Sequence, residues 1–97
     1  MSLQEMIGML QAEKCGPLSG DALDICNANF ADVGANIGGL MATYKLTEGD
    51  VKAGLRTCIP CMTEKGRAAG ACSVEPFKRM PGMTCGHFAA KIFPNMS

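Results

Sequence analysis

Hydrophobic residues recur at helical spacing along most of the chain, and the alternation typical of strands is nearly absent. Near the start, Ser2 and Glu5 form a capping-box pattern, and apolar residues follow at intervals of three and four. Gly16 and Pro17 then supply the signals that end a helix. The pattern therefore predicts a first helix over 3–14.

The longest apolar stripe begins after Ser19, a residue type that favours the N-cap of a helix, and it lasts about five turns. Its members are Leu23, Cys26, Phe30, Val33, Ile37 and Leu40. Glycines at 34, 38 and 39 each weaken a helix by about 1 kcal/mol relative to alanine. We therefore expect one long helix with a kink or break near 34–39. This stretch has too few consecutive apolar residues to span a membrane, because a spanning helix needs about 20 of them.

A second capping pattern, Thr47 with Asp50, predicts a helix over 48–59. Pro60 should end that helix because proline lacks an N–H and restricts the residue before it.

The last third of the chain contains many helix-breaking residues. Residues 63–84 are rich in glycine and proline and are predicted to form an irregular connection. Thr84 can then cap a short final helix that Pro94 stops. The expected fold class is all-α: a small disulfide-stapled bundle of about four short helices, with 1–97 as a single domain.

Composition and charge narrow the range of partners. Nine Lys and Arg balance nine Asp and Glu, and the sequence pI is about 6.5. This balance argues against a nucleic-acid partner, which attracts strongly basic surfaces. With 47% hydrophobic residues the chain should fold, yet it has five aromatics and no Trp. The core is therefore expected to consist of small or flexible side chains.

Six cysteines in so short a chain are typical of a disulfide framework: Cys15, Cys26, Cys58, Cys61, Cys72 and Cys85. Each bridge adds about 2–4 kcal/mol of stability. Six cysteines allow 15 pairings, among which sequence does not choose. We expect Cys15 or Cys26 to bridge to the 58–61 turn, and Cys72 and Cys85 to tie down the irregular segment.

The cysteine content also predicts an oxidising compartment: the exterior of the cell, a periplasm, the mitochondrial intermembrane space or a thylakoid lumen. Glu5 and Glu13 interrupt the first apolar stretch, so it does not resemble a signal peptide. An exported protein is therefore expected to be present here in its mature form.

The last four cysteines support a second hypothesis, because C-x2-C-x10-C-x12-C offers four thiolates to one [4Fe–4S] cluster: Cys58, Cys61, Cys72 and Cys85. The residues around them are Tyr44, CIPC at 58–61, GACSVEP at 70–76, PGMTC at 81–85 and Phe88. With these motifs the segment 44–91 resembles the high-potential iron–sulfur proteins. The resemblance implies a soluble electron carrier in which the four cysteines ligate the cluster and Tyr44 packs against it.

Other site chemistries have less support from the residues. Cys58, Cys61, Cys85 and His87 could surround zinc, but the last two lie closer together than the usual zinc-ligand spacing. The CIPC motif resembles dithiol oxidoreductase motifs but lacks their βαβ context. His87 is the only histidine, and no motif orients it for catalysis. We therefore expect no metal, no cofactor and no enzymatic activity.

The leading expectation is a non-enzymatic protein that acts through protein–protein contacts, as an accessory subunit of a larger assembly or as a secreted interaction protein. The expected interaction face continues the core seam: Val33, Ile37, Leu40, Met41 and Tyr44. Gly34 and Gly38 are spaced so that another backbone can approach closely. No residue points specifically to a small apolar ligand.

Overall fold

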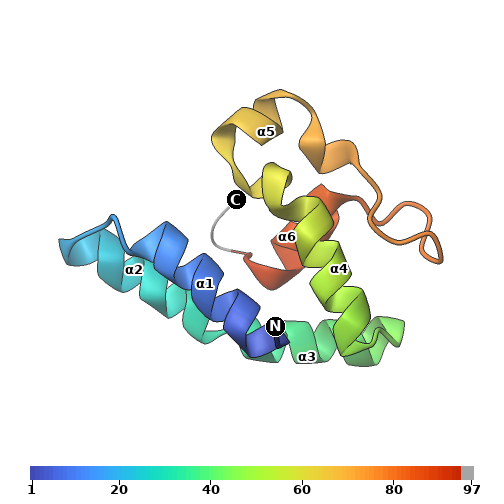
Figure 1. The fold of residues 1–97 in the computed structure, drawn as a ribbon, viewed down its shortest axis with the longest axis horizontal. Helices are drawn as coiled ribbons and strands as arrows, with labels where there is room; N and C mark the ends of the chain where they lie inside the picture. Colours follow the sequence, from blue (N-terminus) through green and yellow to red (C-terminus); the bar gives the residue numbers. More distant parts are fainter. Residues whose placement is uncertain (95–97) are drawn as a thin grey trace.

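Helices make up the regular structure of the computed structural model, which describes residues 1–94 (Figure 1). In chain order the elements are α1 (Leu3–Cys15), α2 (Gly20–Ala31), α3 (Val33–Tyr44), α4 (Glu48–Cys58), the 3-10 helix η1 (Ile59–Met62), α5 (Glu64–Ala68), the 3-10 helix η2 (Ala71–Ser73) and α6 (Cys85–Ile92). Within residues 1–94 there is no strand, so the predicted all-α class is confirmed. None of the helices in this range combines the length and the apolar character that a bilayer crossing requires.

Hydrogen-bonded caps set the starts of three helices where the sequence predicted them. At α1 the Glu5 N–H donates to Ser2 Oγ at 3.1 Å, and the Ser2 N–H donates to Glu5 Oε1 at 3.2 Å. At α4 the same reciprocal pair forms between Thr47 and Asp50, at 3.1 and 2.9 Å. The Thr84 hydroxyl caps α6 in the same position. These side chains satisfy backbone N–H groups that a helix start leaves unpaired.

The long second helix is instead two helices, α2 and α3, and the break lies at Asp32 rather than near 34–39. Asp32 ends one helix and begins the next, with φ −90° and ψ −7°. The three glycines lie inside α3 in helical conformation. Burial of one face of α3 supplies the stability that their low helix propensity lacks, because tertiary packing dominates the stability of short helices.

The segment predicted to be irregular is partly helical. The chain leaves α4 at Cys58 and continues as the 3-10 helix η1 through Pro60, where proline has ended the α-helix. The 63–84 segment then contains the short elements α5 and η2, and its longest stretch without helical structure is 74–84.

The helices form two groups that meet along a shared core: the α1–α2 hairpin, and α3, α4, α5 and α6 with the two 3-10 helices. In Figure 1, α1 and α2 run antiparallel as a hairpin, and α3 leads on from α2 to pass beneath α4 and α6. The short elements η1, α5 and η2 gather at the far end of α4 and α6. The Cα radius of gyration is 13.1 Å, close to the roughly 12.5 Å of a compact domain of this length.

The core consists of Met, Leu, Ile, Val and Cys side chains, as expected, but it also contains all four phenylalanines. Phe30 of α2 meets Phe93 edge to face, with ring centroids 5.2 Å apart. Phe77 and Phe88 form a second edge-to-face pair at 5.3 Å. Aromatic residues are few, but each phenylalanine buries a large apolar area and therefore occupies the core.

Candidate functional site

Three disulfides use all six cysteines, as the sequence predicted: Cys15–Cys26, Cys58–Cys85 and Cys61–Cys72. Their Cα–Cα distances are 5.6, 5.2 and 4.6 Å, within the usual range of about 4.4–6.8 Å. Such bridges are typical of proteins from oxidising compartments.

The pairing differs from the one expected for the N-terminal cysteines. Cys15 and Cys26 bridge to each other, not to the 58–61 turn, because the tight α1–α2 hairpin places them side by side. The other part of the expectation is confirmed. Cys72 and Cys85 bridge back to the 58–61 turn and so hold the segment between α4 and α6.

The four cysteines proposed as iron ligands lie in these two adjacent bridges. Each of their sulfurs is bonded to another sulfur, so the donor set does not fit a [4Fe–4S] cluster, which requires thiolates. In residues 1–94 no group of three or more His, Cys, Asp or Glu side chains is arranged to hold a metal ion. His87, a candidate zinc ligand in the sequence, has its Nδ1 3.3 Å from the Gly82 carbonyl oxygen. Tyr44, which the iron–sulfur resemblance would pack against a cluster, has its ring centroid 5.7 Å from Lys91 Nζ.

The predicted interaction face is divided between core and surface. Val33, Ile37 and Leu40 are buried and attach α3 to the rest of the protein. Met41 is half-buried, and Tyr44 is 37% exposed. In this fold the surface part of the predicted face is therefore Met41 and Tyr44.

An apolar groove runs between the start of α1 and α3, which we call the α1–α3 groove. Its volume is about 410 Å³, and it is lined by Ser2, Leu3, Gln4, Ile7, Gly34, Ile37, Gly38, Met41 and Glu48. A Cβ atom added at Gly34 or Gly38 would meet nothing within 4 Å, so both glycines face open space. Glu48 supplies the one ionisable side chain of this lining, and its Oε1 accepts a hydrogen bond from the Leu3 N–H at 3.0 Å.

A smaller apolar cavity of about 180 Å³ lies between the two groups of helices. We call it the inter-group cavity, and its lining is Leu10, Lys14, Phe30, Cys61, Met62, Arg67, Cys72, Gly86, Ala89 and Phe93. Lys14 Nζ donates a hydrogen bond to the Met62 carbonyl oxygen at 3.0 Å. Sequence reasoning missed this cavity because its walls come from elements far apart in the chain, and no local pattern marks it.

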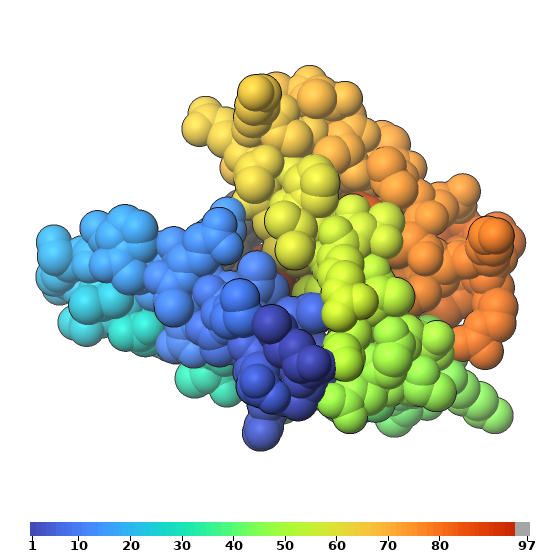
Figure 2. Space-filling model, in the orientation of Figure 1, coloured from blue at the N-terminus to red at the C-terminus, as the bar shows by residue number. Residues whose placement is uncertain are grey.

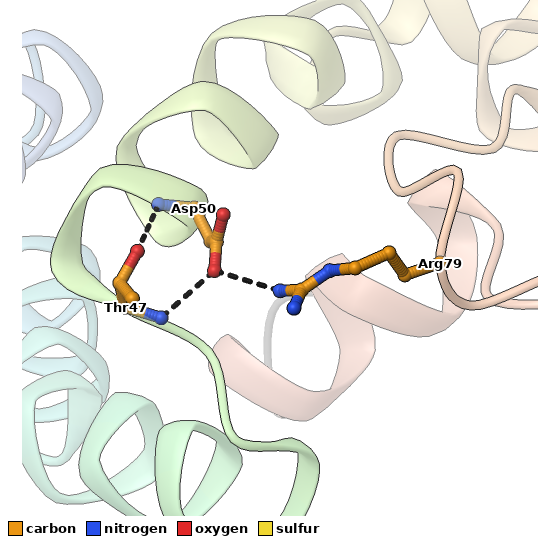
Figure 3. Close-up of polar contacts among 3 residues, drawn as sticks. All are labelled: Thr47, Asp50 and Arg79. Atoms are coloured by element: carbon orange, nitrogen blue, oxygen red, sulfur yellow. Dashed lines mark hydrogen bonds and ion pairs between the residues drawn. The ribbon is translucent and has the colours of Figure 1, made fainter.

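The clearest electrostatic feature lies at the start of α4, where Asp50 meets Thr47 and Arg79 (Figure 3). The pKa of Asp50 is lowered from its ordinary value of 3.8, first by the hydrogen bond from the Thr47 N–H, then by the Thr47 hydroxyl, and also by the Arg79 guanidinium. Arg79 Nη2 lies 3.0 Å from Asp50 Oδ2, but the arginine side chain is 69% exposed. This carboxylate therefore acts as a helix cap.

Fold and cavities together define a small, disulfide-stabilised all-α protein that carries an apolar groove and an apolar cavity. No family model, curated protein or solved structure matches the chain.

Proposed function

We propose that this chain is a non-enzymatic interaction module that seats an apolar helix of another protein in the α1–α3 groove. It would act as an accessory subunit of a larger assembly or as a secreted interaction protein. The three disulfides support a setting in an oxidising compartment.

The observation that carries this proposal is that two glycines, Gly34 and Gly38, line the groove. Gly34, Ile37, Gly38 and Met41 follow one another at the spacing of a single helix face, and all four line the groove. The two glycines leave room for an approaching backbone, while the half-buried Met41 offers an apolar contact. Grooves of this kind bind amphipathic helices through apolar anchors.

The charge of the groove selects the chemistry of the partner. The one ionisable side chain in its lining, Glu48, already accepts a hydrogen bond from the backbone of α1. Glu48 would repel an acidic helix face, and a basic face would lose more hydration against the apolar lining than one exposed carboxylate returns. The partner face is therefore expected to be uncharged and built of aliphatic residues.

Two adjacent glycines provide a matched test of this proposal. Gly38→Leu places a side chain in the groove, whereas Gly39→Leu places one on the same helix outside the residues that line it. Both changes raise helix propensity by about 1 kcal/mol, so both variants should fold. Each tagged variant would be expressed in the source cell, and the size of its native complex would be measured by gel filtration.

We expect wild type and Gly39→Leu to elute as a complex larger than the 10.2 kDa chain, and Gly38→Leu to elute alone. The complex should also cross-link through a photoreactive residue at Met41. Elution of the wild-type chain as a free monomer, or equal loss of the complex in both variants, would refute the docking role of the groove.

A further inference from the structure

We propose that the inter-group cavity binds a small amphiphilic carboxylate, that is, a short acyl chain or a single aromatic ring that carries one carboxylate. This site is separate from the α1–α3 groove, with which it shares no lining residue. It would give the protein a small-molecule ligand in addition to the proposed helix partner.

The size of the cavity limits the apolar part of this ligand. Its volume of about 180 Å³ is close to that of an engineered apolar cavity of about 150 Å³ that binds benzene. Leu10, Phe30, Ala89 and Phe93 supply apolar walls. A ring or one short acyl chain fits such a volume, whereas a membrane lipid with two long chains does not.

The charges at the cavity select the polar part. Of the residues between 1 and 94 that line it, only Lys14 and Arg67 are charged, and both are cationic. Within residues 1–94, no carboxylate lies within ion-pair distance of Lys14 or Arg67. The ion pair found in these residues joins Arg79 to Asp50. The lining therefore has an uncompensated positive charge, and an anion is the group that would complete it.

The position of Lys14 fits this role. Its Nζ is held at 3.0 Å from the Met62 carbonyl oxygen, and an ammonium group has two further N–H donors for a ligand. Arg67 comes from α5, on the other group of helices. Figure 2 shows the hollow between the blue atoms of α1 and the yellow atoms of the 59–68 segment. A carboxylate at this opening would lie between the two cations while its apolar body faced the phenylalanines.

The test compares three probes that share one chain length and differ in charge: octanoate, 1-octanol and octylamine. Each would be titrated into the full chain and followed by calorimetry and by backbone amide NMR shifts. We expect octanoate to bind about tenfold more tightly than octanol, and octylamine more weakly than either, with shifts centred on Ala89 and Phe93. Equal affinity for the three probes, or no binding of octanoate at millimolar concentration, would overturn the proposal.

Variants separate the apolar contribution from the charge. Ala89→Phe fills the cavity and should abolish binding, while Ala90→Phe, on the exposed side of α6, should leave it unchanged. Arg67→Met should weaken octanoate about fivefold and leave octanol unaffected, because it removes one exposed cation and keeps an apolar stem.

Arg56→Met removes a cation outside the cavity and serves as the charge control. Octanoate binding that survives Ala89→Phe, or that Arg56→Met weakens as much as Arg67→Met, would place the ligand elsewhere. Gly38→Leu, which blocks the α1–α3 groove, should not change octanoate affinity, so failure of this site is distinguishable from failure of the helix-docking proposal.

Discussion

Gly54 allows α4 to pack directly against the second pair of phenylalanines. A Cβ atom at this position would lie 2.6 Å from Phe77 Cζ and 3.2 Å from Phe88 Cζ, both closer than ordinary van der Waals contact. Phe88 is completely buried, so its ring has little room to move aside. The absent side chain at Gly54 thus determines the spacing between α4 and the core.

Replacing Gly54 with alanine should therefore destabilise the protein, although alanine is the better helix former. Overpacking of a dense core costs about 1–3 kcal/mol, which exceeds the helix-propensity gain of about 0.5–1 kcal/mol. Thermal unfolding followed by circular dichroism should show Tm lower by about 5 °C or more. Gly49→Ala, on the exposed first turn of the same helix, should keep or raise Tm. A Gly54→Ala variant as stable as wild type would show that the core accommodates the methyl group.

The capped start of α4 is an element whose stability depends on pH. In the folded protein the pKa of Asp50 is below its ordinary value of 3.8, because the Thr47 N–H and hydroxyl and the Arg79 guanidinium favour the carboxylate. A carboxyl group with a lowered folded pKa stabilises the fold above its unfolded pKa, and that stabilisation is lost as pH falls through the folded value.

Asp50→Asn should remove this contribution. We expect the variant to have a lower Tm than wild type at pH 7, and we expect the difference to shrink as pH falls below about 3.8. Arg79→Met should have the smaller effect of the two, since Thr47 contributes first to the lowered pKa and the arginine side chain is 69% exposed. Melting curves between pH 2 and pH 7 measure both effects. If the Tm difference between wild type and Asp50→Asn stays constant over this range, the Asp50 carboxylate does not stabilise the fold in the way proposed.

At the scale of the whole molecule, no disulfide joins the α1–α2 hairpin to the remaining helices. Cys15–Cys26 lies within the hairpin, and the other two bridges lie within the C-terminal half. Noncovalent contacts join the hairpin to the remaining helices instead: Phe30 with Phe93, the Lys14 bond to the Met62 carbonyl oxygen, and the Leu3 N–H bond to Glu48. We therefore expect the free energy of local unfolding to differ between the α1–α2 hairpin and the remaining helices.

Removing the hairpin bridge with a Cys15→Ala, Cys26→Ala double variant should lower the free energy of unfolding by about 3 kcal/mol, the loop-entropy value for this spacing. Hydrogen exchange should show faster exchange in α1 and α2 than in α4 and α6, which retain their own bridges. Intact mass should rise by about four daltons on reduction of the variant and about six for wild type, two hydrogens per bridge. Equal loss of protection in all helices would show that the two halves unfold as one unit.

Local patterns and tertiary packing account for different parts of this protein. The capping boxes at Ser2 and Thr47 and the stop at Pro60 were predictable, because each depends on residues within one turn of the chain. The break at Asp32 was not, because the three glycines of α3 favour a break and only burial of the helix face opposes it. Two residues of the predicted interaction face, Ile37 and Met41, line the α1–α3 groove. The wall of the groove that α1 supplies could not be inferred from the apolar stripe.

The sequence by itself determined the all-α class, most helix boundaries and the oxidised state of the cysteines, since periodicity, caps and cysteine count are properties of neighbouring residues or of composition. Only the tertiary structure decided which cysteines pair, which apolar residues are buried, and where the groove and the cavity lie. These features depend on distances between residues such as Lys14 and Arg67, which are remote in the chain and are brought together only when the helices pack.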